Sequence, residues 1–380
     1  MLFLLIKSSQ QWLEANGLGF LRVFTFVTFQ AVFAIVVSFL FCLLLGPRVI
    51  EWLRRHKLGD LASFDQAEMD AAMQSKKGTP TMGGVLIIAS ILITTLLLAD
   101  LKNFYVLLGM AALVGLGAIG AVDDWLKLTS GWREGSRQGL QGAEKLIGQI
   151  GLAAILSYFT WRHGAANPVA QELYLPFIKQ PVMMLSLGLF VLLGVVTITG
   201  FSNAVNLSDG LDGLAGGCMA IVSFVFLVLA LLCGIPQLAR FLLLPTVPTS
   251  DQMAVLAGAM MGACLGFLWF NCSPARVFMG DTGSLALGGL IAYIAIVIRH
   301  EFTLVLVGGV FVAEAVSVII QRYYFKYTRW RFGEGIRFFL MAPIHHHFQK
   351  KGWTETQVVV RFWLINAVLA AMAIASVKLR

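Results

Sequence analysis

The sequence contains ten apolar runs, each close to the ~20 residues that a helix needs to cross a bilayer. Hydrophobic residues make up 58% of the 380-residue chain and charged residues only 13%. A soluble domain of this length could not bury so much apolar surface. We therefore predict an all-α integral membrane protein that forms a single polytopic domain over residues 1–380. The predicted spans are 22–45, 81–99, 104–122, 145–161, 182–200, 213–233, 253–270, 284–298, 303–322 and 358–377.

Basic residues are distributed unevenly among the loops that connect these runs. Loops after the odd-numbered runs contain eighteen Lys and Arg residues, whereas loops after the even-numbered runs contain five. Because cytoplasmic loops carry the excess of basic residues, the odd-numbered loops are expected in the cytoplasm and both termini outside. The net charge of +8 then faces anionic lipid headgroups and cytoplasmic anions, and not nucleic acid.

The N-terminus and the cysteines suggest no processing or cross-linking. Residues Met1–Lys7 lack the basic region of a signal peptide, so the first apolar run is expected to be retained. The segment before residue 21 is short and mildly amphipathic, as in segments that lie along a membrane interface. The five cysteines form no Cys-x-x-Cys pair, which indicates neither a disulfide framework nor a zinc site.

The stretch 203–217 places two asparagines and two aspartates between two apolar runs. Charge and irregular backbone at membrane depth must line a cavity or face water. Asp209 and Asp212 are three residues apart and would share one face of a helix start. Gly210 and Gly213 would let backbone amides approach a ligand, so the stretch suits a hydrated cation and a phosphate. A polar turn with a helix N-cap is the alternative.

The third apolar run ends in the adjacent carboxylates Asp123 and Asp124. They repel one another unless a cation lies between them. Neighbours in a helix point about 100° apart, so one carboxylate can bind a ligand while the other orients it or takes a proton. Lys77 and Lys145 lie at membrane edges and could hold phosphate as point charges. Anchoring of the spans by their long side chains is the alternative role.

Two later loops on the same side also carry polar side chains. Asp281 precedes the eighth run, where it could cap a helix or point into the cytoplasmic mouth, and Phe278 could stack on a base or pack. The three histidines 345–347 lack the i, i+4 spacing of a zinc pair and suggest a donor-rich loop for phosphate. Glu314 lies inside the ninth run, as a functional carboxylate or as a hydrogen-bonding partner between helices.

The polar side chains therefore collect at one membrane face, while the opposite loops contain no comparable residues. This asymmetry predicts Mg²⁺-assisted transfer of a phosphate-containing group, where a lipid headgroup meets a cytosolic donor. A lipid or solute transporter is the alternative from another class. It would place polar groups near the midplane and on both sides.

Six motifs also resemble a known family: KKGTPTMGG at 76–84, VDD at 122–124, NAVNLSDGLDGLA at 203–215, GFLWFN at 266–271, FMGDTGSLALGG at 278–289 and APIHHHF at 342–348. In this order, over nearly all of residues 45–375, they are similar to the phospho-N-acetylmuramoyl-pentapeptide transferases, which belong to the polyprenyl-phosphate N-acetylhexosamine-1-phosphate transferases. The resemblance implies ten transmembrane helices, a homodimer and the bacterial cytoplasmic (inner) membrane. It also implies Mg²⁺-dependent transfer of phospho-MurNAc-pentapeptide from UDP-MurNAc-pentapeptide to undecaprenyl phosphate, which gives lipid I and UMP.

The resemblance further implies a role for each matching residue. Asp281 would bind Mg²⁺, and Asp123 would position or deprotonate the lipid phosphate with the support of Asp124. The uridine end of the donor would contact Asp209, Asp212, Asn271, Phe278 (by stacking), Lys77 and Gln321. The phosphate path would be lined by Asn206, Lys127, Lys145, His345 and His346.

The sequence departs from the family pattern at two places, and the reaction route and the donor each have an alternative. Ser208 stands where the family has threonine and keeps the hydroxyl. The segment 322–344, which includes an aromatic and basic run, is longer than in the family. The lipid phosphate could attack the donor directly, or an aspartate could first form a covalent intermediate. A transferase that moves GlcNAc-1-phosphate from UDP-GlcNAc would share the same aspartates.

Overall fold

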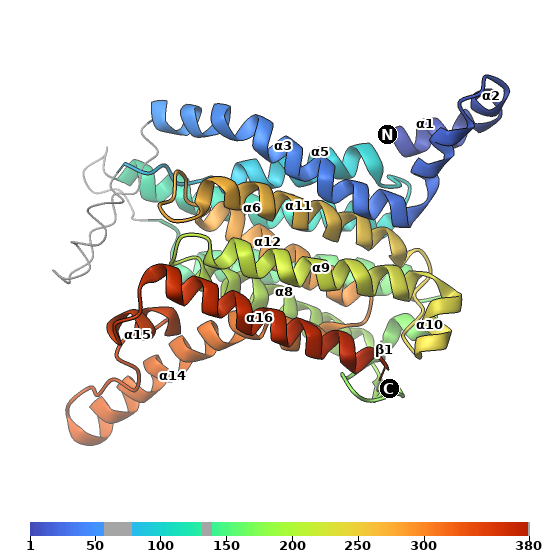
Figure 1. The fold of residues 1–380 in the computed structure, drawn as a ribbon. Coiled ribbons are helices and arrows are strands. Elements are labelled where there is room, and N and C mark those ends of the chain that lie inside the picture. Colours follow the sequence, from blue (N-terminus) through green and yellow to red (C-terminus); the bar gives the residue numbers. More distant parts are fainter. Residues whose placement is uncertain (57–77, 131–138, 379–380) are drawn as a thin grey trace.

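The computed structural model describes residues 1–56, 78–130 and 139–378, which are mostly helical (Figure 1). Helices of the main bundle run side by side, and the marked N- and C-terminal ends lie at the same end of it (Figure 1). The helices are α1 (Leu2–Ser8), α2 (Gln10–Ala15), η1 (Gly19–Thr25), α3 (Val27–Arg55), α5 (Gly84–Leu98), α6 (Phe104–Ser130), α7 (Gly142–Gly164), η2 (Pro168–Gln171), α8 (Leu187–Ser208), α9 (Leu214–Gly234), α10 (Pro236–Leu242), η3 (Ser250–Gln252), α11 (Met253–Asn271), α12 (Gly280–Val297), α13 (Glu301–Val307), α14 (Gly309–Phe332), α15 (Ile344–Lys350) and α16 (Glu355–Lys378). Strands β1 (Glu172–Leu173) and β2 (Met183–Met184) pair antiparallel.

The predicted apolar runs all overlap helices of the structure. Seven helices in the described ranges are long and apolar enough to cross a membrane, and α13 with α14 would make an eighth if the bent pair is one span. Helix α5 is a shorter apolar helix, and α7 is not among the seven. The chain is thus a multi-pass all-α membrane protein, and the number of ten crossings stays a prediction.

The ninth run is not the straight span 303–322 that the sequence suggested. Helices α13 and α14 meet at an angle of 83°, with Gly308 between them. A Cβ atom at Gly308 would lie 2.8 Å from the Phe201 ring, so the bend also brings this backbone close to α8. Consecutive glycines weaken a helix at this point, while the aromatic and basic residues that follow extend α14 to Phe332.

Two other boundaries differ from the prediction. The first long helix begins at Val27 and continues to Arg55, beyond the hydrophobic part of the run. The asparagines of the 203–217 stretch lie in the last turns of α8, so only residues 209–213 form the connection to α9. Asp209 and Asp212 therefore do not share a helical face. Gly213, at φ +82°, sets the direction in which α9 begins.

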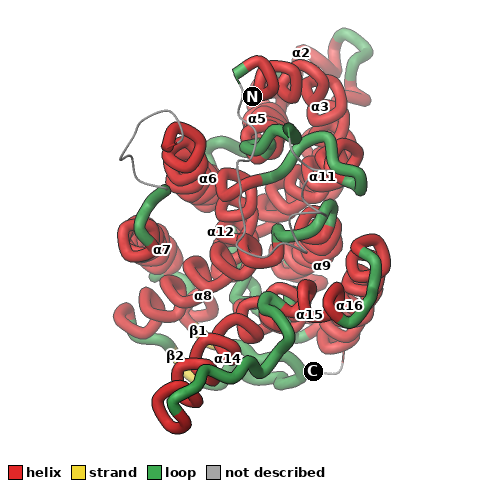
Figure 2. Tube along the Cα trace, turned by 90° about the vertical axis from the view of Figure 1, so that its left-hand side faces the viewer, coloured by secondary structure: helices red, strands yellow, loops and turns green. Residues whose placement is uncertain are grey.

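Helix α12 forms the centre of the bundle. Of its 18 residues, 89% are buried, a larger share than in the other long apolar helices of the described ranges. In the rotated view it lies near the middle, with α6, α8, α9 and α11 around it (Figure 2). Gly84 at the start of α5 faces Gly283 of α12, where a Cβ atom would overlap the backbone. Small residues thus permit the close helix packing that a lipid environment favours.

A buried ion pair lies at the bundle end that carries the chain termini. Arg299 and Glu301, both at most 2% exposed, are 2.7 Å apart between Nη1 and Oε1. Arg299 Nε also donates to the carbonyl oxygen of Glu172, 127 residues earlier. The pair therefore ties the α12–α13 connection to β1. Loop composition did not reveal it, because both residues looked like ordinary members of a tight turn.

Replacement of Gly84 by alanine tests the contact between α5 and α12. We expect Gly84→Ala to lower the free energy of unfolding by roughly 1–3 kcal/mol, because the new methyl group has only backbone to displace. Thermal unfolding in detergent measures the change. Gly151→Ala is the matched control, since a Cβ atom at Gly151 of α7 meets nothing within 4 Å. Equal melting temperatures for the two variants would contradict the packing argument.

Candidate active site

The predicted site residues come together at the bundle end opposite the marked chain ends. Five elements contribute to this end: the last turns of α6 and α8, the first turns of α7 and α12, and the short helix α15 (Figure 1). The elements are far apart in sequence. Their polar side chains meet because α6 and α8 pack against α12 and end where α12 begins, while α7 packs against α6 and α8 and starts at the same end.

The centre of the site is a cluster of two carboxylates and two ammonium groups. Lys127 Nζ lies 2.8 Å from Asp123 Oδ2 and 3.1 Å from Asp281 Oδ2. Lys145 Nζ lies 2.6 Å from Asp281 Oδ2 and 3.7 Å from Asp123 Oδ2. Asp123 is buried, whereas the Lys127 side chain is 48% exposed. The cluster is therefore held inside the protein and open to solvent on the Lys127 side, since the Lys145 side chain is only 14% exposed.

Asp124 has a different task from its neighbour. Its carboxylate accepts hydrogen bonds from the backbone N–H groups of Asp281 (3.1 Å) and Thr282 (2.9 Å) and from Thr282 Oγ1 (2.6 Å). These N–H groups belong to the first turn of α12, where they have no partner within the helix. Asp124 thus caps α12 from another helix and determines where the Asp281 side chain lies.

Side chains from α8 complete the surroundings of Asp281. Asn206 Nδ2 donates to Asp281 Oδ1 at 2.7 Å and to Ser284 Oγ at 2.9 Å. Asp209, half-buried just after α8, accepts from the N–H of Gly280. Burial, followed by the negative charges of Asp281 and Asp124, raises the pKa of Asp209 well above its usual range. Additional positive charge would therefore be favourable here.

The residues predicted to hold uridine build the scaffold around the cluster. Asn271 accepts from Gly213 N at 3.0 Å and donates to Val277 O at 2.9 Å. Asp212 Oδ2 accepts from Ala275 N at 3.1 Å. These bonds join the 209–213 turn to the 272–279 loop. Both side chains therefore stabilise the packing of these two segments.

Phe278 lies half-buried in the same 272–279 loop, where its backbone is paired with an earlier segment. Its N–H donates to Pro80 O at 2.8 Å, and its carbonyl oxygen accepts from Gly83 N at 2.8 Å. The turn before α5 is thereby attached to the start of α12. Lys77, predicted to lie near the uridine, is outside the described residues.

The histidine segment forms helix α15, which covers the 209–213 turn. His345 is buried, with Nδ1 3.0 Å from Glu314 Oε2, and Nε2 lies beside Gly210. Of the two roles considered for Glu314, this contact supports that of a bonding partner between segments, because its carboxylate pairs with His345. His346 Nδ1 is 2.7 Å from Gln349 Oε1. The ring of His346 is half-buried, 4.1 Å from that of His345.

Gln321 bonds to the backbone of a later segment, and its contact with the nucleotide stays a prediction. Its Oε1 accepts from Phe339 N at 2.8 Å, which attaches the segment before α15 to α14. Sequence reasoning also missed Thr282, Ser284 and Glu355, which bond to Asp124, Asn206 and the backbone of Asp212. For Thr282 and Ser284, the only local signal in the sequence was that they carry hydroxyl groups close after Asp281.

The structure therefore brings Asp123, Lys127, Lys145, Asn206 and Asp281 into one set of contacts. Alternating carboxylate and ammonium groups at a solvent-open position can bind phosphate through the lysines and a cation through the carboxylates. Asp124 and the α12 cap position this set.

The separate tasks of the adjacent aspartates lead to a testable difference. We expect Asp124→Asn to lose about 1–3 kcal/mol of unfolding free energy together with activity, because an amide cannot accept all three bonds to α12. Asp123→Asn, the matched control, should lose activity with a smaller change in melting temperature. Thermal unfolding in detergent compares the variants. Greater destabilisation by Asp123→Asn would show that the assignment of the cap is wrong.

Comparisons with known proteins agree with this arrangement. Residues 103–299 match the model of Glycosyl transferase family 4, and residues 76–88 match Phospho-N-acetylmuramoyl-pentapeptide-transferase signature 1. The chain is 43% identical over 361 residues to a phospho-N-acetylmuramoyl-pentapeptide-transferase of Thermodesulfovibrio yellowstonii, covering 95% of this chain and 96% of the relative. It is 45% identical over 362 residues to the protein of that name from Desulfotalea psychrophila, covering 94% and 96%. The chain belongs to the phospho-N-acetylmuramoyl-pentapeptide-transferase family.

Proposed function

We propose that the chain transfers phospho-MurNAc-pentapeptide from UDP-MurNAc-pentapeptide to undecaprenyl phosphate, giving lipid I and UMP in peptidoglycan synthesis. The observation that carries this proposal is the cluster of Asp123, Lys127, Lys145 and Asp281 at one end of a membrane bundle. Such a position can be reached from the cytosol by a nucleotide donor and from the bilayer by a lipid phosphate. The two relatives are phospho-N-acetylmuramoyl-pentapeptide-transferases, which supports the same transfer.

The donor set is compatible with Mg²⁺ as the cofactor. Mg²⁺ prefers oxygen ligands and is usually bound by one or two carboxylates together with substrate phosphates. Asp281 offers two carboxylate oxygens, and Asp123 lies within hydrogen-bonding reach of it. Among the described residues, no group of three or more His, Cys, Asp and Glu side chains forms a ready metal cage. We propose that Asp281 holds Mg²⁺ jointly with the donor phosphates, and that bound Mg²⁺ stabilises negative charge on the departing UMP.

The reaction must bring two polyanions together, so neutralisation and alignment of charge account for most of the catalysis. Lys127 and Lys145 supply that positive charge, and the substrate phosphates would replace the carboxylates as their partners. Asp123 would orient the lipid phosphate or take its proton. In the one-step route, a lipid phosphate oxygen bonds to the β-phosphorus as its bond to UMP breaks. In the two-step route, an aspartate oxygen first takes the phospho-sugar and then passes it to the lipid.

We favour the one-step route because the oxygens of both aspartates already have donors. Asp123 Oδ1 accepts from Leu140 N at 2.7 Å, and its Oδ2 faces Lys127. Asp281 is bonded by Asn206 and Lys145. Carboxylates with such partners are suited to orienting a cation or a phosphate. A phosphoaspartyl adduct is the species that would distinguish the two routes.

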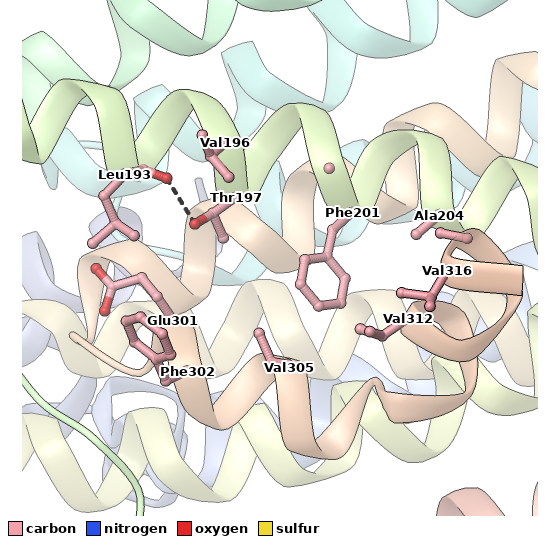
Figure 3. A pocket seen from close by; sticks show the side chains of 12 residues that line it. Leu193, Val196, Thr197, Phe201, Ala204, Glu301, Phe302, Val305, Val312 and Val316 are labelled. Carbon is pink, nitrogen blue, oxygen red and sulfur yellow. Dashed lines mark hydrogen bonds between the residues drawn. The ribbon is translucent and has the colours of Figure 1, made fainter. Parts of the chain in front are cut away.

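An apolar groove between α8 and α13–α14 supports a long lipid substrate. It has a volume of about 290 Å³ and is lined by apolar side chains, with Glu301 at one end and Ala204 and Val316 at the other (Figure 3). Val196 and Val305 in its wall are 61% and 44% exposed, so the groove is open toward the bilayer. It leads along α8 toward Asn206, two residues beyond Ala204. We propose that it holds the first isoprene units of the carrier.

The orientation and assembly state follow from the same proposal. The cluster would face the cytoplasm, where UDP-linked donors are made, and both chain termini would then lie outside. This agrees with the basic residues of the odd-numbered loops and with the bacterial inner membrane as the location. A homodimer is proposed on the resemblance alone.

Release of UMP by the purified protein is the direct test of the reaction. With UDP-MurNAc-pentapeptide, undecaprenyl phosphate and Mg²⁺, we expect UMP release that chelation of the metal abolishes. Asp281→Asn should reduce the rate by about 10²-fold or more, because charge stabilisation at the transition state is lost. UDP-GlcNAc as a competing donor separates this reaction from that of the related transferases. Equal rates for wild type and Asp281→Asn would contradict the metal assignment, and no release with either donor would contradict the transfer.

Filling the groove tests the proposed lipid site. A Cβ atom at Gly200 meets nothing within 4 Å, so the leucine side chain of Gly200→Leu would occupy part of the groove without a clash. We expect KM for undecaprenyl phosphate to rise about tenfold, the effect of losing roughly two buried methylene contacts, while KM for the nucleotide donor stays unchanged. Gly188→Leu is the control, since Gly188 lies on the same helix at a separate hollow beside α7, where a Cβ atom also meets nothing within 4 Å. Equal KM values for undecaprenyl phosphate in the two variants would show that the lipid does not bind in this groove.

A further inference from the structure

The end of α14 is a feature that the transfer reaction leaves unexplained. Helix α14 leaves the bundle and ends away from it, on the side where α15 lies (Figure 1). Gly333, at φ +81°, ends the helix, and its N–H donates to Arg329 O at 3.1 Å. The chain then returns along α14 to reach α15. This part of the protein is the aromatic and basic segment 322–344.

The returning segment covers one face of α14. Ile336 N donates to Thr328 Oγ1 at 2.9 Å, and Phe339 N donates to Gln321 Oε1 at 2.8 Å. The rings of Phe338 and Tyr324 lie edge to face at 5.4 Å. The contacted positions of the helix are 321, 324, 325 and 328, which share one face at helical spacing; Thr328 is buried, and Tyr324 and Phe325 stay 37% and 38% exposed. This hairpin therefore satisfies its own polar groups on the covered side.

The opposite face of α14 carries aromatic side chains that no other described segment of the chain covers. Tyr323, Tyr327 and Trp330 follow at spacings of four and three residues, and they are 69%, 54% and 80% exposed. The same stripe continues toward the bundle in Ile319, which is 53% exposed. Large aromatic residues with a polar atom favour the interface between hydrocarbon and water. The stripe therefore runs from a bilayer-facing surface into a zone typical of lipid headgroups.

The charge of the segment agrees with that environment. Residues 322–340 contain five basic side chains and one acidic side chain. The basic residues are exposed, and three of them, Arg322, Lys326 and Arg329, form a stripe directly beside the aromatic one. Basic residues next to an apolar helix face bind anionic lipid surfaces.

We propose that the exposed face of α14 from Tyr323 to Trp330 lies in the headgroup region of the membrane and binds anionic phospholipid headgroups through the neighbouring basic stripe. The bilayer thereby stabilises the position of the hairpin. The hairpin in turn contacts α15, since Leu340 N donates to His347 Nδ1 at 3.1 Å. The surface acts as a positioning device for the segment over the site. The inference depends only on the protein spanning a membrane, and not on the transfer reaction.

Spin labels on the purified full-length protein in vesicles test the depth of this face. Cys272 is the one exposed cysteine in the described ranges, so Cys272→Ser provides the background for Tyr327→Cys. Lys351→Cys gives a reference at the exposed end of α15, and Leu364→Cys gives a bilayer reference, since Leu364 is 62% exposed on α16. Oxygen and a water-soluble nickel chelate report access from lipid and from water. In vesicles with phosphatidylglycerol, we expect nickel access at Tyr327 to be at least about twofold lower than at Lys351.

The charge is tested by vesicle composition and by removal of the basic stripe. In phosphatidylcholine vesicles without phosphatidylglycerol, the Tyr327 label should become more accessible to nickel. Arg322→Gln, Lys326→Gln and Arg329→Gln combined should remove that dependence on composition, while the label at Leu364 stays unchanged. Nickel access equal to that of Lys351 in both vesicle types would overturn the membrane assignment and point to a protein partner. Low access in both types would overturn the requirement for anionic lipid.

Discussion

The capping of α12 by Asp124 is the interaction on which the site depends. Carboxylates are costly to bury unless charges or hydrogen-bond donors compensate them. Asp124 obtains its donors from the first turn of α12, and Asp281 in that turn obtains them from Lys127, Lys145 and Asn206. Each acid is thus satisfied by partners on helices other than its own. The consequence is a rigid arrangement of charge at the end of an otherwise apolar bundle.

Close packing of small residues makes that arrangement possible. Gly84 against Gly283 brings α5 to the start of α12, and the backbone pairing of Gly83 with Phe278 follows from it. Gly308 allows α13 and α14 to bend beside Phe201, which leaves an apolar groove next to α8. A polar cluster and a lipid-facing groove therefore meet along one helix. Their proximity suits a reaction that joins a nucleotide donor to a lipid acceptor.

Several residues that the sequence singled out for function also form bonds that hold the protein together. Asn271 joins two loops, Gln321 binds the segment before α15, and Glu314 pairs with His345. A sequence motif contains both kinds of residue, because a site requires its scaffold as much as its contacts. Spacing cannot separate the two kinds when the partner lies many residues away. For Asn271 and Gly213 that separation is 58 residues.

The sequence by itself determined the membrane class, the approximate helices, the family and the collection of polar residues at one end. These properties depend on local hydropathy, side-chain type and motif order, which are readable without contacts. Only the tertiary structure decided which aspartate caps α12, where the ninth run bends and which face of α14 stays uncovered. Asp124 and Thr282 are 158 residues apart, so their contact depends on which helices pack together. Packing is a property of the whole chain, and no local pattern of residues contains it.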